Sequence, residues 1–177
     1  MSSNIADLDI EHLGEEPLPP KEGWYHIKLI RYTEDLTQRG RVHKCTWQII
    51  GTPPELRDEL GKYVYESYFE YSSAFVKQSA LIGWACGLYS KEYLANLQAN
   101  EEDLPMPDFG AWLLATCIGK VKYEKDKNDP NKSYVRLGFS YKPLDHETVQ
   151  LAGIVLDKAS IEAGVSTQPA NSNADFI

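Results

Sequence analysis

The first half of the chain alternates between apolar and polar side chains. In residues 24–32, Ile27 and Leu29 share one face of an extended strand, and the other face carries Trp24, His26, Lys28 and Tyr32. This period of two is typical of a half-buried β-strand. Residues 41–50, after a polar turn at 34–40, and residues 62–71, after an insertion at 51–61, have the β-branched and aromatic content of two more strands. The pattern therefore predicts three strands before residue 72.

The pattern changes to a helical period after residue 72. Apolar residues between Phe75 and Leu88 recur three and four positions apart, and two serines precede them as N-cap candidates. A shorter helix is expected at 91–98, before the acidic, proline-containing stretch 101–110 interrupts regular structure. Two more strands are predicted at 111–124 and 133–142. Their core residues are expected to be Val121, Val135, Leu137 and Phe139.

The order strand, strand, strand, helix, strand, strand is that of the OB-fold, a five-stranded Greek-key barrel with a central α-helix. We therefore predict a mainly β protein whose OB-fold domain spans residues 21–145. Residues 1–20 are predicted to be an extended acidic segment that ends in Pro-Leu-Pro-Pro. Residues 146–177 are predicted to hold a weak helix and a flexible acidic C-terminal tail.

Charge is distributed unevenly along the chain. The 177 residues include 18 Lys and Arg against 26 Asp and Glu, a net charge of −8, which by itself argues against a protein that binds nucleic acid. Residues 1–20 contribute −5 and residues 143–177 contribute −4, which leaves residues 21–142 at +1. The predicted domain is therefore nearly neutral and can carry basic surfaces.

No sequence motif indicates an enzyme, and we expect neither a metal nor a cofactor. The four histidines are dispersed, and no phosphate-binding or dinucleotide-binding glycine motif occurs. Cys45, Cys86 and Cys117 are too widely spaced to indicate a zinc site or a disulfide framework. No apolar run is long enough to span a membrane and the N-terminus is acidic, so we expect a cytoplasmic protein.

The stretch from Gly110 to Pro143 combines an apolar base with a basic and aromatic tip. Cations neutralise phosphates, and each base stacked on a ring contributes about 1–3 kcal/mol to binding. The sequence thus predicts a surface that binds single-stranded DNA without reading its sequence. The rings expected to stack on bases are Trp24, Tyr32, Tyr123 and Tyr134. The cations expected to follow the phosphates are Lys28, Arg31, Arg41, Lys44, Lys120, Lys122, Lys125, Lys127, Lys132 and Arg136. Three acids interrupt the hairpin part of this set, so a solvated hairpin tip is the alternative: Glu124, Asp126 and Asp129.

The chain ends in a polar stretch followed by Asn-Ala-Asp-Phe-Ile. An acid followed by an apolar pair resembles the tail with which bacterial single-stranded DNA-binding proteins recruit partner enzymes. The usual acidic run and the proline before the final phenylalanine are absent here. The resemblance implies that Asp175, Phe176 and Ile177 bind replication or recombination proteins. Such a tail can also cover the protein's own basic surface until DNA displaces it.

Residues 23–32, 62–88 and 110–143 together resemble a phage-encoded family of OB-fold proteins that bind single-stranded DNA. The resemblance covers residues 20–143. It implies a role in bacteriophage DNA replication and recombination in the cytoplasm of the host bacterial cell, with single-stranded DNA as the ligand. Self-association and the choice between DNA and RNA stay open. The acidic ends leave a second interpretation, a protein-interaction module or a DNA-mimicking inhibitor of a host DNA enzyme.

Overall fold

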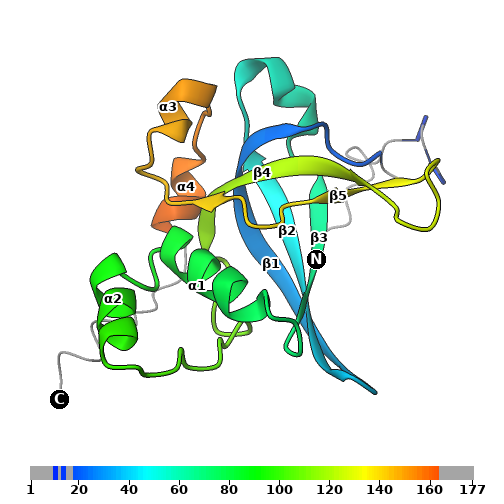
Figure 1. Ribbon diagram of the computed structural model, residues 1–177. Coiled ribbons are helices and arrows are strands. Elements are labelled where there is room, and N and C mark those ends of the chain that lie inside the picture. The colour runs from blue at the N-terminus through cyan, green and yellow to red at the C-terminus, as the bar shows by residue number, and fades with distance from the viewer. Residues whose placement is uncertain (1–9, 12, 15–17, 164–177) are drawn as a thin grey trace, which may run out of the picture.

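The structure, a computed structural model, describes residues 10–11, 13–14 and 18–163. It has a mixed α/β fold around a six-stranded antiparallel sheet (Figure 1). β1 (Gly23–Thr37) and β2 (Gly40–Gly51) form a long hairpin, and β3 (Tyr63–Phe69) pairs with β2. β4 (Thr116–Lys125) pairs with β1 and then with both β5 (Ser133–Arg136) and β6 (Tyr141–Lys142). The strand order is therefore β3-β2-β1-β4-β5, with β6 beside β4.

Helices fill the connection between β3 and β4, as the sequence predicts. α1 (Phe75–Ala85) and α2 (Lys91–Ala99) lie there, and a short 3-10 helix, η2 (Pro54–Glu59), occupies the insertion before β3. After α1 the chain turns back sharply, and a Cβ atom at Gly83 would lie 2.2 Å from the ring of Tyr89. Only glycine allows this close approach. α3 (Thr148–Ala152) and α4 (Lys158–Glu162) follow β6, where a weak helix is predicted.

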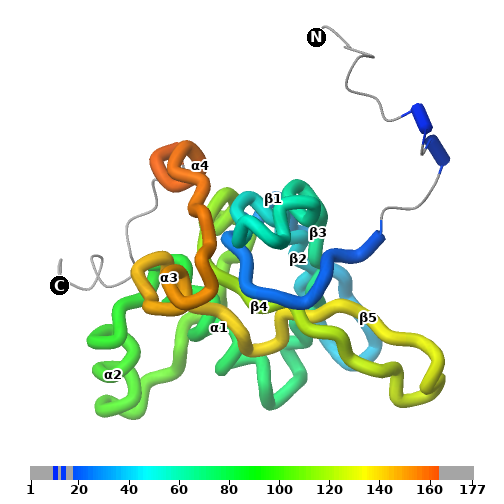
Figure 2. Tube along the Cα trace, turned by 90° about the horizontal axis from the view of Figure 1, so that it is seen from above, coloured from blue at the N-terminus to red at the C-terminus, as the bar shows by residue number. Residues whose placement is uncertain are grey.

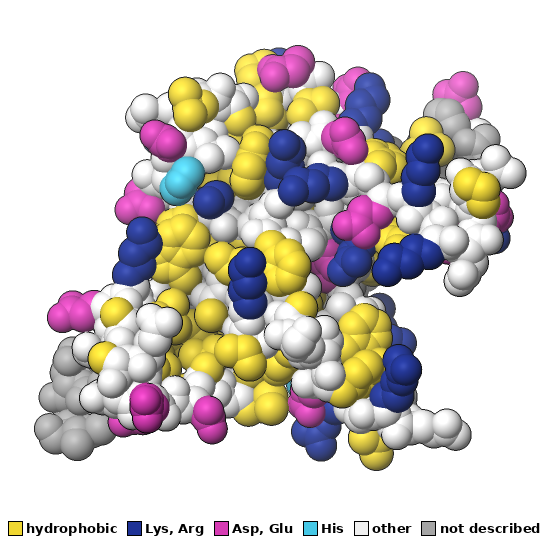
Figure 3. Space-filling model, in the orientation of Figure 1, with side chains coloured by type: hydrophobic (Ala, Val, Ile, Leu, Met, Phe, Trp, Pro, Cys, Tyr) yellow, Lys and Arg dark blue, Asp and Glu magenta, His cyan; other side chains and the backbone are white. Residues whose placement is uncertain are grey.

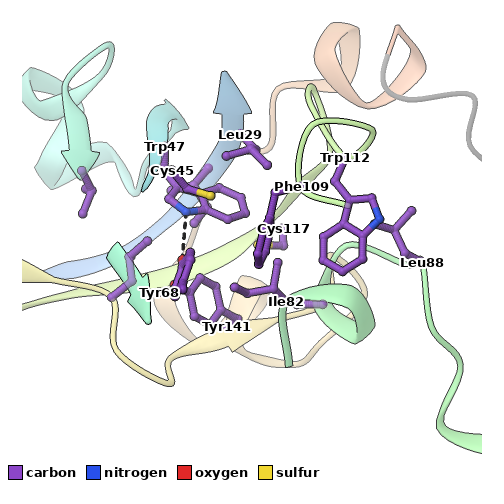
Figure 4. Packing of buried hydrophobic residues seen from close by; sticks show 14 of the residues in the cluster. Leu29, Cys45, Trp47, Tyr68, Ile82, Leu88, Phe109, Trp112, Cys117 and Tyr141 are labelled. Atoms are coloured by element: carbon purple, nitrogen blue, oxygen red, sulfur yellow. Dashed lines mark hydrogen bonds between the residues drawn. The ribbon is translucent and has the colours of Figure 1, made fainter. Parts of the chain in front are cut away.

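The core lies between the inner face of the curved sheet and α1, and it is rich in aromatic rings (Figure 4). The indole Nε1 of Trp47 donates a hydrogen bond to the hydroxyl of Tyr68 at 3.2 Å, and that hydroxyl lies 2.5 Å from the hydroxyl of Tyr141. These polar atoms are thus paired with one another where water has no access. Ile82 of α1 and Phe109 complete this side of the core.

The sheet is not closed into a barrel. Along the described residues no backbone ladder joins β3 to β5. The carboxylate of Glu66 on β3 instead accepts hydrogen bonds from the N–H groups of Leu137 and Gly138, just after β5. The prediction of a closed, five-stranded barrel is therefore wrong. The predicted order of strands and helix along the chain is confirmed, apart from the added β6.

Three predicted boundaries also change. β1 and β2 continue through much of the predicted turn at 34–40, because cross-strand pairing holds both strands as far as Thr37 and Gly40. The predicted strand at 111–124 begins only at Thr116. The predicted strand at 133–142 breaks into two, with Gly138 in the left-handed region at φ +58°. Phe139 follows this break and is 45% exposed, so its predicted place in the core is wrong.

The C-terminal part of the described chain packs on the outer face of the sheet. The N–H of Val155 donates to the carbonyl oxygen of Thr52, and the N–H of Asp157 donates to Nδ1 of the buried His26, each at 3.0 Å. Burial lowers the pKa of His26 to about 4, and the nearby Asp157 offsets only part of that shift. Figure 2 shows α3 and α4 at the opposite end of the molecule from the β4–β5 hairpin.

Candidate nucleic-acid interface

The outer face of β3 presents a row of aromatic side chains, which we call the β3 platform. It consists of Tyr63, Tyr65 and Phe69, which alternate along the strand with inward-facing residues. Tyr65 is the most open, at 70% exposed, and its ring centroid lies 6.4 Å from that of Tyr63. Tyr71 extends the row, 5.5 Å from Phe69. Open ring faces in a row are the groups on which successive unpaired bases stack.

A pocket of about 1220 Å³, the seam pocket, lies between β3 and β5. Its lining includes Val64, Tyr65 and Glu66 from β3, and Tyr134 and Arg136 from β5. The predicted DNA-binding residues Tyr134 and Arg136 therefore face the β3 platform across the pocket. Arg136 lies 3.8 Å from Glu66 and 3.4 Å from Glu124, so its charge is already partly paired. Burial raises the pKa of the Glu66 carboxyl group, and the hydrogen bond from Leu137 and the Arg136 charge lower it only in part.

Protein groups cross the seam and line the pocket near the start of β3. The Glu66 carboxylate bridges β3 to the backbone just after β5, and the pocket lining on β3 continues past it to Ser67 and Phe69. Near the start of β3, residues 18–20 line the pocket. The backbone N–H of Lys21 donates to Glu59 at 3.2 Å, and the hydroxyl of Tyr123 donates to the carbonyl oxygen of Pro20 at 2.7 Å. The predicted stacking residue Tyr123 thus holds the N-terminal segment against the pocket.

The β4–β5 hairpin carries exposed lysines that make no ion pair within the described part of the chain: Lys122 on β4, and Lys125, Lys127 and Lys132 at the tip. The acids among them have other contacts. Asp126 accepts a hydrogen bond from the N–H of Asn128 at 2.8 Å, and Asp129 accepts one from Asn131 at 3.0 Å. These carboxylates hold the turn, while Glu124 contacts Arg136. The lysine charges are therefore available to a polyanion.

A second, smaller hollow of about 230 Å³ lies on the outer face across β1, β2 and β3. Arg31, Lys44 and Tyr65 are among its lining residues. Lys44 contacts Asp35 at 2.6 Å, and both side chains are about half exposed. Exposed pairs of this kind contribute about 0–1 kcal/mol, so a phosphate can replace the Asp35 carboxylate at little cost. Arg31 has no ion pair with another described residue.

The platform, the seam pocket, the small hollow and the hairpin lysines form one surface, which we call the β3 cleft. Figure 3 shows a notch at the edge of the molecule between the β4–β5 hairpin above and the β1–β2 hairpin below. β3 runs between the bases of these two hairpins in Figure 1. The structure thus brings eight of the predicted residues together around it: Arg31, Lys44, Lys122, Lys125, Lys127, Lys132, Tyr134 and, at the seam, Arg136.

Tyr32 lies on the other side of the sheet. The ladder between β1 and β2 shifts by one residue between Leu29 and Arg31, and Tyr32 pairs with the buried Cys45. A bulge of this kind reverses the face of every following residue. The predicted common face of Trp24, Lys28 and Tyr32 is therefore wrong beyond the bulge.

A hydrogen-bonded chain holds Tyr32 in this position. Its hydroxyl lies 2.6 Å from Nδ1 of His43 and donates to Glu34 at 2.9 Å, while Nε2 of His43 lies 2.7 Å from Glu70. Arg41 in turn contacts Glu34 at 3.2 Å. Burial, together with Glu34, raises the pKa of Tyr32, so its hydroxyl stays protonated at neutral pH. Tyr32 and Arg41 are thus already engaged with protein groups.

The remaining predicted residues lie on β1 and β4, where other protein groups already contact them. The ammonium group of Lys28 donates to the hydroxyl of Ser160 at 3.3 Å, under the C-terminal segment. The ammonium group of Lys120 lies 5.8 Å from the ring centroid of Trp24 and occupies that face of the indole. Asp175, Phe176 and Ile177 lie outside the described residues.

The aromatic row on β3 is the part of the cleft that sequence reasoning missed. The segment 62–71 was recognised as a strand, and its odd positions between 63 and 71 are aromatic except for Ser67. Its even positions include Val64 and Tyr68, which are also apolar, so alternation alone gives no clear inner face. An acidic residue normally marks the exposed face of a strand. Glu66 would therefore have indicated that the even positions are exposed, which is wrong because Glu66 is buried.

No family model, curated protein or solved structure matches the chain. Within residues 10–11, 13–14 and 18–163, no helix is long and apolar enough to cross a membrane. The same residues contain no group of three or more His, Cys, Asp or Glu side chains placed to hold a metal ion.

Proposed function

We propose that this chain is a non-catalytic protein that binds single-stranded DNA in the β3 cleft without reading its sequence. The observation that carries the proposal is the β3 platform, a row of exposed rings beside a hairpin whose lysines have no ion pair within the described residues. Rings bind bases and cations bind phosphates, so the two features together match both parts of a nucleotide chain. Neither ring stacking nor phosphate contact requires a particular base.

The strand connections favour the same function. We propose that the sheet is an opened relative of the OB-fold, because β1 pairs with both β2 and β4 and the main helix follows β3. OB-folds bind oligonucleotides on the face of their second and third strands and through the loops after strands one and four. The β3 platform and the two hairpins occupy those positions. The similarity of strand connections supports the site's own chemistry without replacing it.

The role in bacteriophage replication and recombination is part of the proposal. It rests on the family resemblance of residues 20–143 and on the chain's last residues, which have the acid-then-apolar order of a tail that recruits partner enzymes. We expect Asp175, Phe176 and Ile177 to bind those partners and not to contribute to DNA affinity.

Fluorescence anisotropy of a labelled 30-nucleotide oligo-dT, titrated with the protein at low and moderate salt, tests the proposal. We expect tight binding at low salt that weakens steeply as salt rises, because lysines that contact phosphates release counterions. A duplex of equal length should bind much more weakly, since its bases are already stacked. A variant lacking residues 166–177 should bind as tightly as the full chain or more tightly. Failure of both proteins to bind oligo-dT at low salt would refute the proposal.

The second candidate is a protein-interaction module, and it is favoured by the edges of β3 and β5 that pair with no other strand of the described residues. Free strand edges can accept an extended segment of another protein. Reversing the charge of Lys122 and Lys125 distinguishes the candidates, because these side chains lie on the hairpin and away from both strand edges' backbone groups. The double variant should lose DNA binding under the first candidate and keep its protein partner under the second.

A further inference from the structure

We infer that the seam pocket binds the hydrogen-bonding edges of unpaired bases through free backbone groups of β3 and β5. The inference rests on the proposed function and deepens it. Stacking on the β3 platform accounts for contact with base faces. The seam pocket adds contact with base edges, and it thereby gives the protein a physical reason to reject a duplex.

The backbone of β3 directs polar groups into the pocket. In an antiparallel ladder, the N–H and C=O groups of alternate residues point to the partner strand and those of the residues between point away. The N–H of Glu70 donates to the carbonyl oxygen of Arg41 at 3.1 Å, so the even-numbered residues of β3 direct their backbone groups to β2. The odd-numbered residues that line the pocket therefore present their backbone groups to it: Tyr63, Tyr65 and Ser67. Among the described residues, none of these groups has a backbone partner.

The backbone of β5 also directs polar groups into the pocket, from the side opposite β3. The N–H of Asp126 donates to the carbonyl oxygen of Lys132 at 2.9 Å, which fixes the alternation of the β4–β5 ladder. Ser133 and Val135 consequently direct their backbone groups away from β4 and into the seam pocket, which both residues line. The next residue in this series is Leu137, and a carboxylate of β3 already accepts its N–H. Two strand edges thus face each other, and their donors and acceptors at these positions have no backbone partner in the part of the chain that the structure describes.

A side-chain bridge across the seam favours a base over an inserted polypeptide strand. A strand pairing with β3 and β5 would have to run along the whole seam. The Glu66 bridge crosses the seam just after β5, before the pocket lining reaches Ser67 and Phe69, and residues 18–20 line the pocket near the start of β3. A base is flat, enters from the open side, and carries donors and acceptors on one edge. Ligand pockets commonly measure about 300–1,000 Å³, so about 1220 Å³ leaves room for more than one base.

The surroundings of the pocket suit the rest of a nucleotide. Tyr65 and Tyr134 supply rings on the two sides, and the lysines at the hairpin tip adjoin β5. Each backbone position offers both a donor and an acceptor, so every base can find a partner and no base is selected. In a duplex the same base edges are paired with the complementary strand, which removes them from reach.

Two oligonucleotides of 30 residues, one of thymidine and one of N3-methylthymidine, test the inference with the unaltered protein. The methyl group removes the N3–H donor and blocks the pairing edge, and it changes neither the phosphate charge nor the ring available for stacking. We expect the methylated strand to bind at least about tenfold more weakly at equal salt, the effect of one lost hydrogen bond to a desolvated group. Equal affinity for both strands would overturn the inference and leave the proposed function intact. No binding to the thymidine strand would refute the proposed function itself.

A pair of protein variants locates the contact. Ser133→Pro removes one N–H that points into the pocket, at an edge position where proline does not break the β4–β5 ladder. Ser133→Ala is the matched control, because it alters the side chain and keeps the N–H. We expect the proline variant to bind the thymidine strand more weakly and to discriminate less against methylation than the alanine variant. If the two variants discriminate equally, β5 does not contact the bases. Should thermal unfolding show that the proline variant is not folded, the two oligonucleotides decide the question with the unaltered protein.

Discussion

Replacing Tyr65 with threonine should weaken the binding of single-stranded DNA and leave the fold unchanged. Tyr65 is 70% exposed and stands in the middle of the β3 platform. Threonine keeps the preference for a strand and removes the ring. Because no core contact is lost, we expect the free energy of unfolding to change by less than about 0.5 kcal/mol, the usual range for open surface positions.

The expected loss of affinity follows from the stacking contribution. One base on one ring is worth about 1–3 kcal/mol, which corresponds to an increase of about 5- to 150-fold in the dissociation constant. Since the ring carries no charge, the slope of log affinity against log salt should not change. Loss of affinity at constant slope would therefore identify a stacking contact and separate it from a phosphate contact.

The measurement is the anisotropy titration with oligo-dT at several salt concentrations. Tyr65→Phe keeps the ring and should bind like the unaltered protein. Leu151→Ala is a control for location, because Leu151 is 80% exposed on α3, at the far end of the molecule from the hairpin. If Tyr65→Thr binds as tightly as Leu151→Ala, then β3 is not the stacking surface and the proposed site is wrong.

Three further outcomes are expected. Each phosphate contact on a single strand contributes about 0.7 to the steepness of log affinity against log salt. Replacing the three lysines at the hairpin tip (Lys125, Lys127 and Lys132) with alanine should therefore reduce that steepness by about 2, and an unchanged slope would place the phosphates elsewhere. Glu66→Ala leaves two backbone N–H groups after β5 without their acceptor, and it should lower the free energy of unfolding by about 1–3 kcal/mol, measured by urea denaturation. His26 has a pKa lowered to about 4, from 6.5, so the stability it contributes is present above pH 6.5 and is lost as the pH falls toward 4. Between pH 7 and pH 5 the unaltered protein should therefore lose about 2 kcal/mol more stability than His26→Gln, and an equal loss in both would contradict the cause given for the shift.

Much of the fold could be predicted because alternation and helical period are local properties of the sequence. The strands containing Ile27 and Trp47 and the helix containing Ile82 were all located in this way. The bulge beside Ile30 leaves only one trace in the sequence, the adjacent apolar residues Leu29 and Ile30, and a single pair of this kind does not identify a bulge. The failure to close the barrel could not be predicted either, because contact between β3 and β5 depends on segments about 70 residues apart.

In the candidate site, too, features that are local in the sequence could be predicted, and features that depend on long-range packing could not. The lysines of the β4–β5 hairpin are close in sequence, so composition alone pointed to them. Whether these lysines are free of ion pairs depends on what the neighbouring acids contact, and Asp126 and Asp129 accept hydrogen bonds from backbone N–H groups of the loop. Tyr65 was visible as a strand residue but had no assigned face. Glu66 in the same strand reads as a surface acid, and only the packing of β5 makes it a buried one.

The Glu66 bridge also has a consequence for protein engineering. A ladder of backbone hydrogen bonds is made by groups that every residue except proline possesses, so substitution barely changes its width. Here one side chain sets the spacing between the two strands. Glu66→Asp shortens that reach by one methylene group, and Glu66→Gln keeps the reach while removing the charge. A small library of substitutions at this one codon would therefore give a series of variants that differ in the spacing between β3 and β5 and share the same aromatic core.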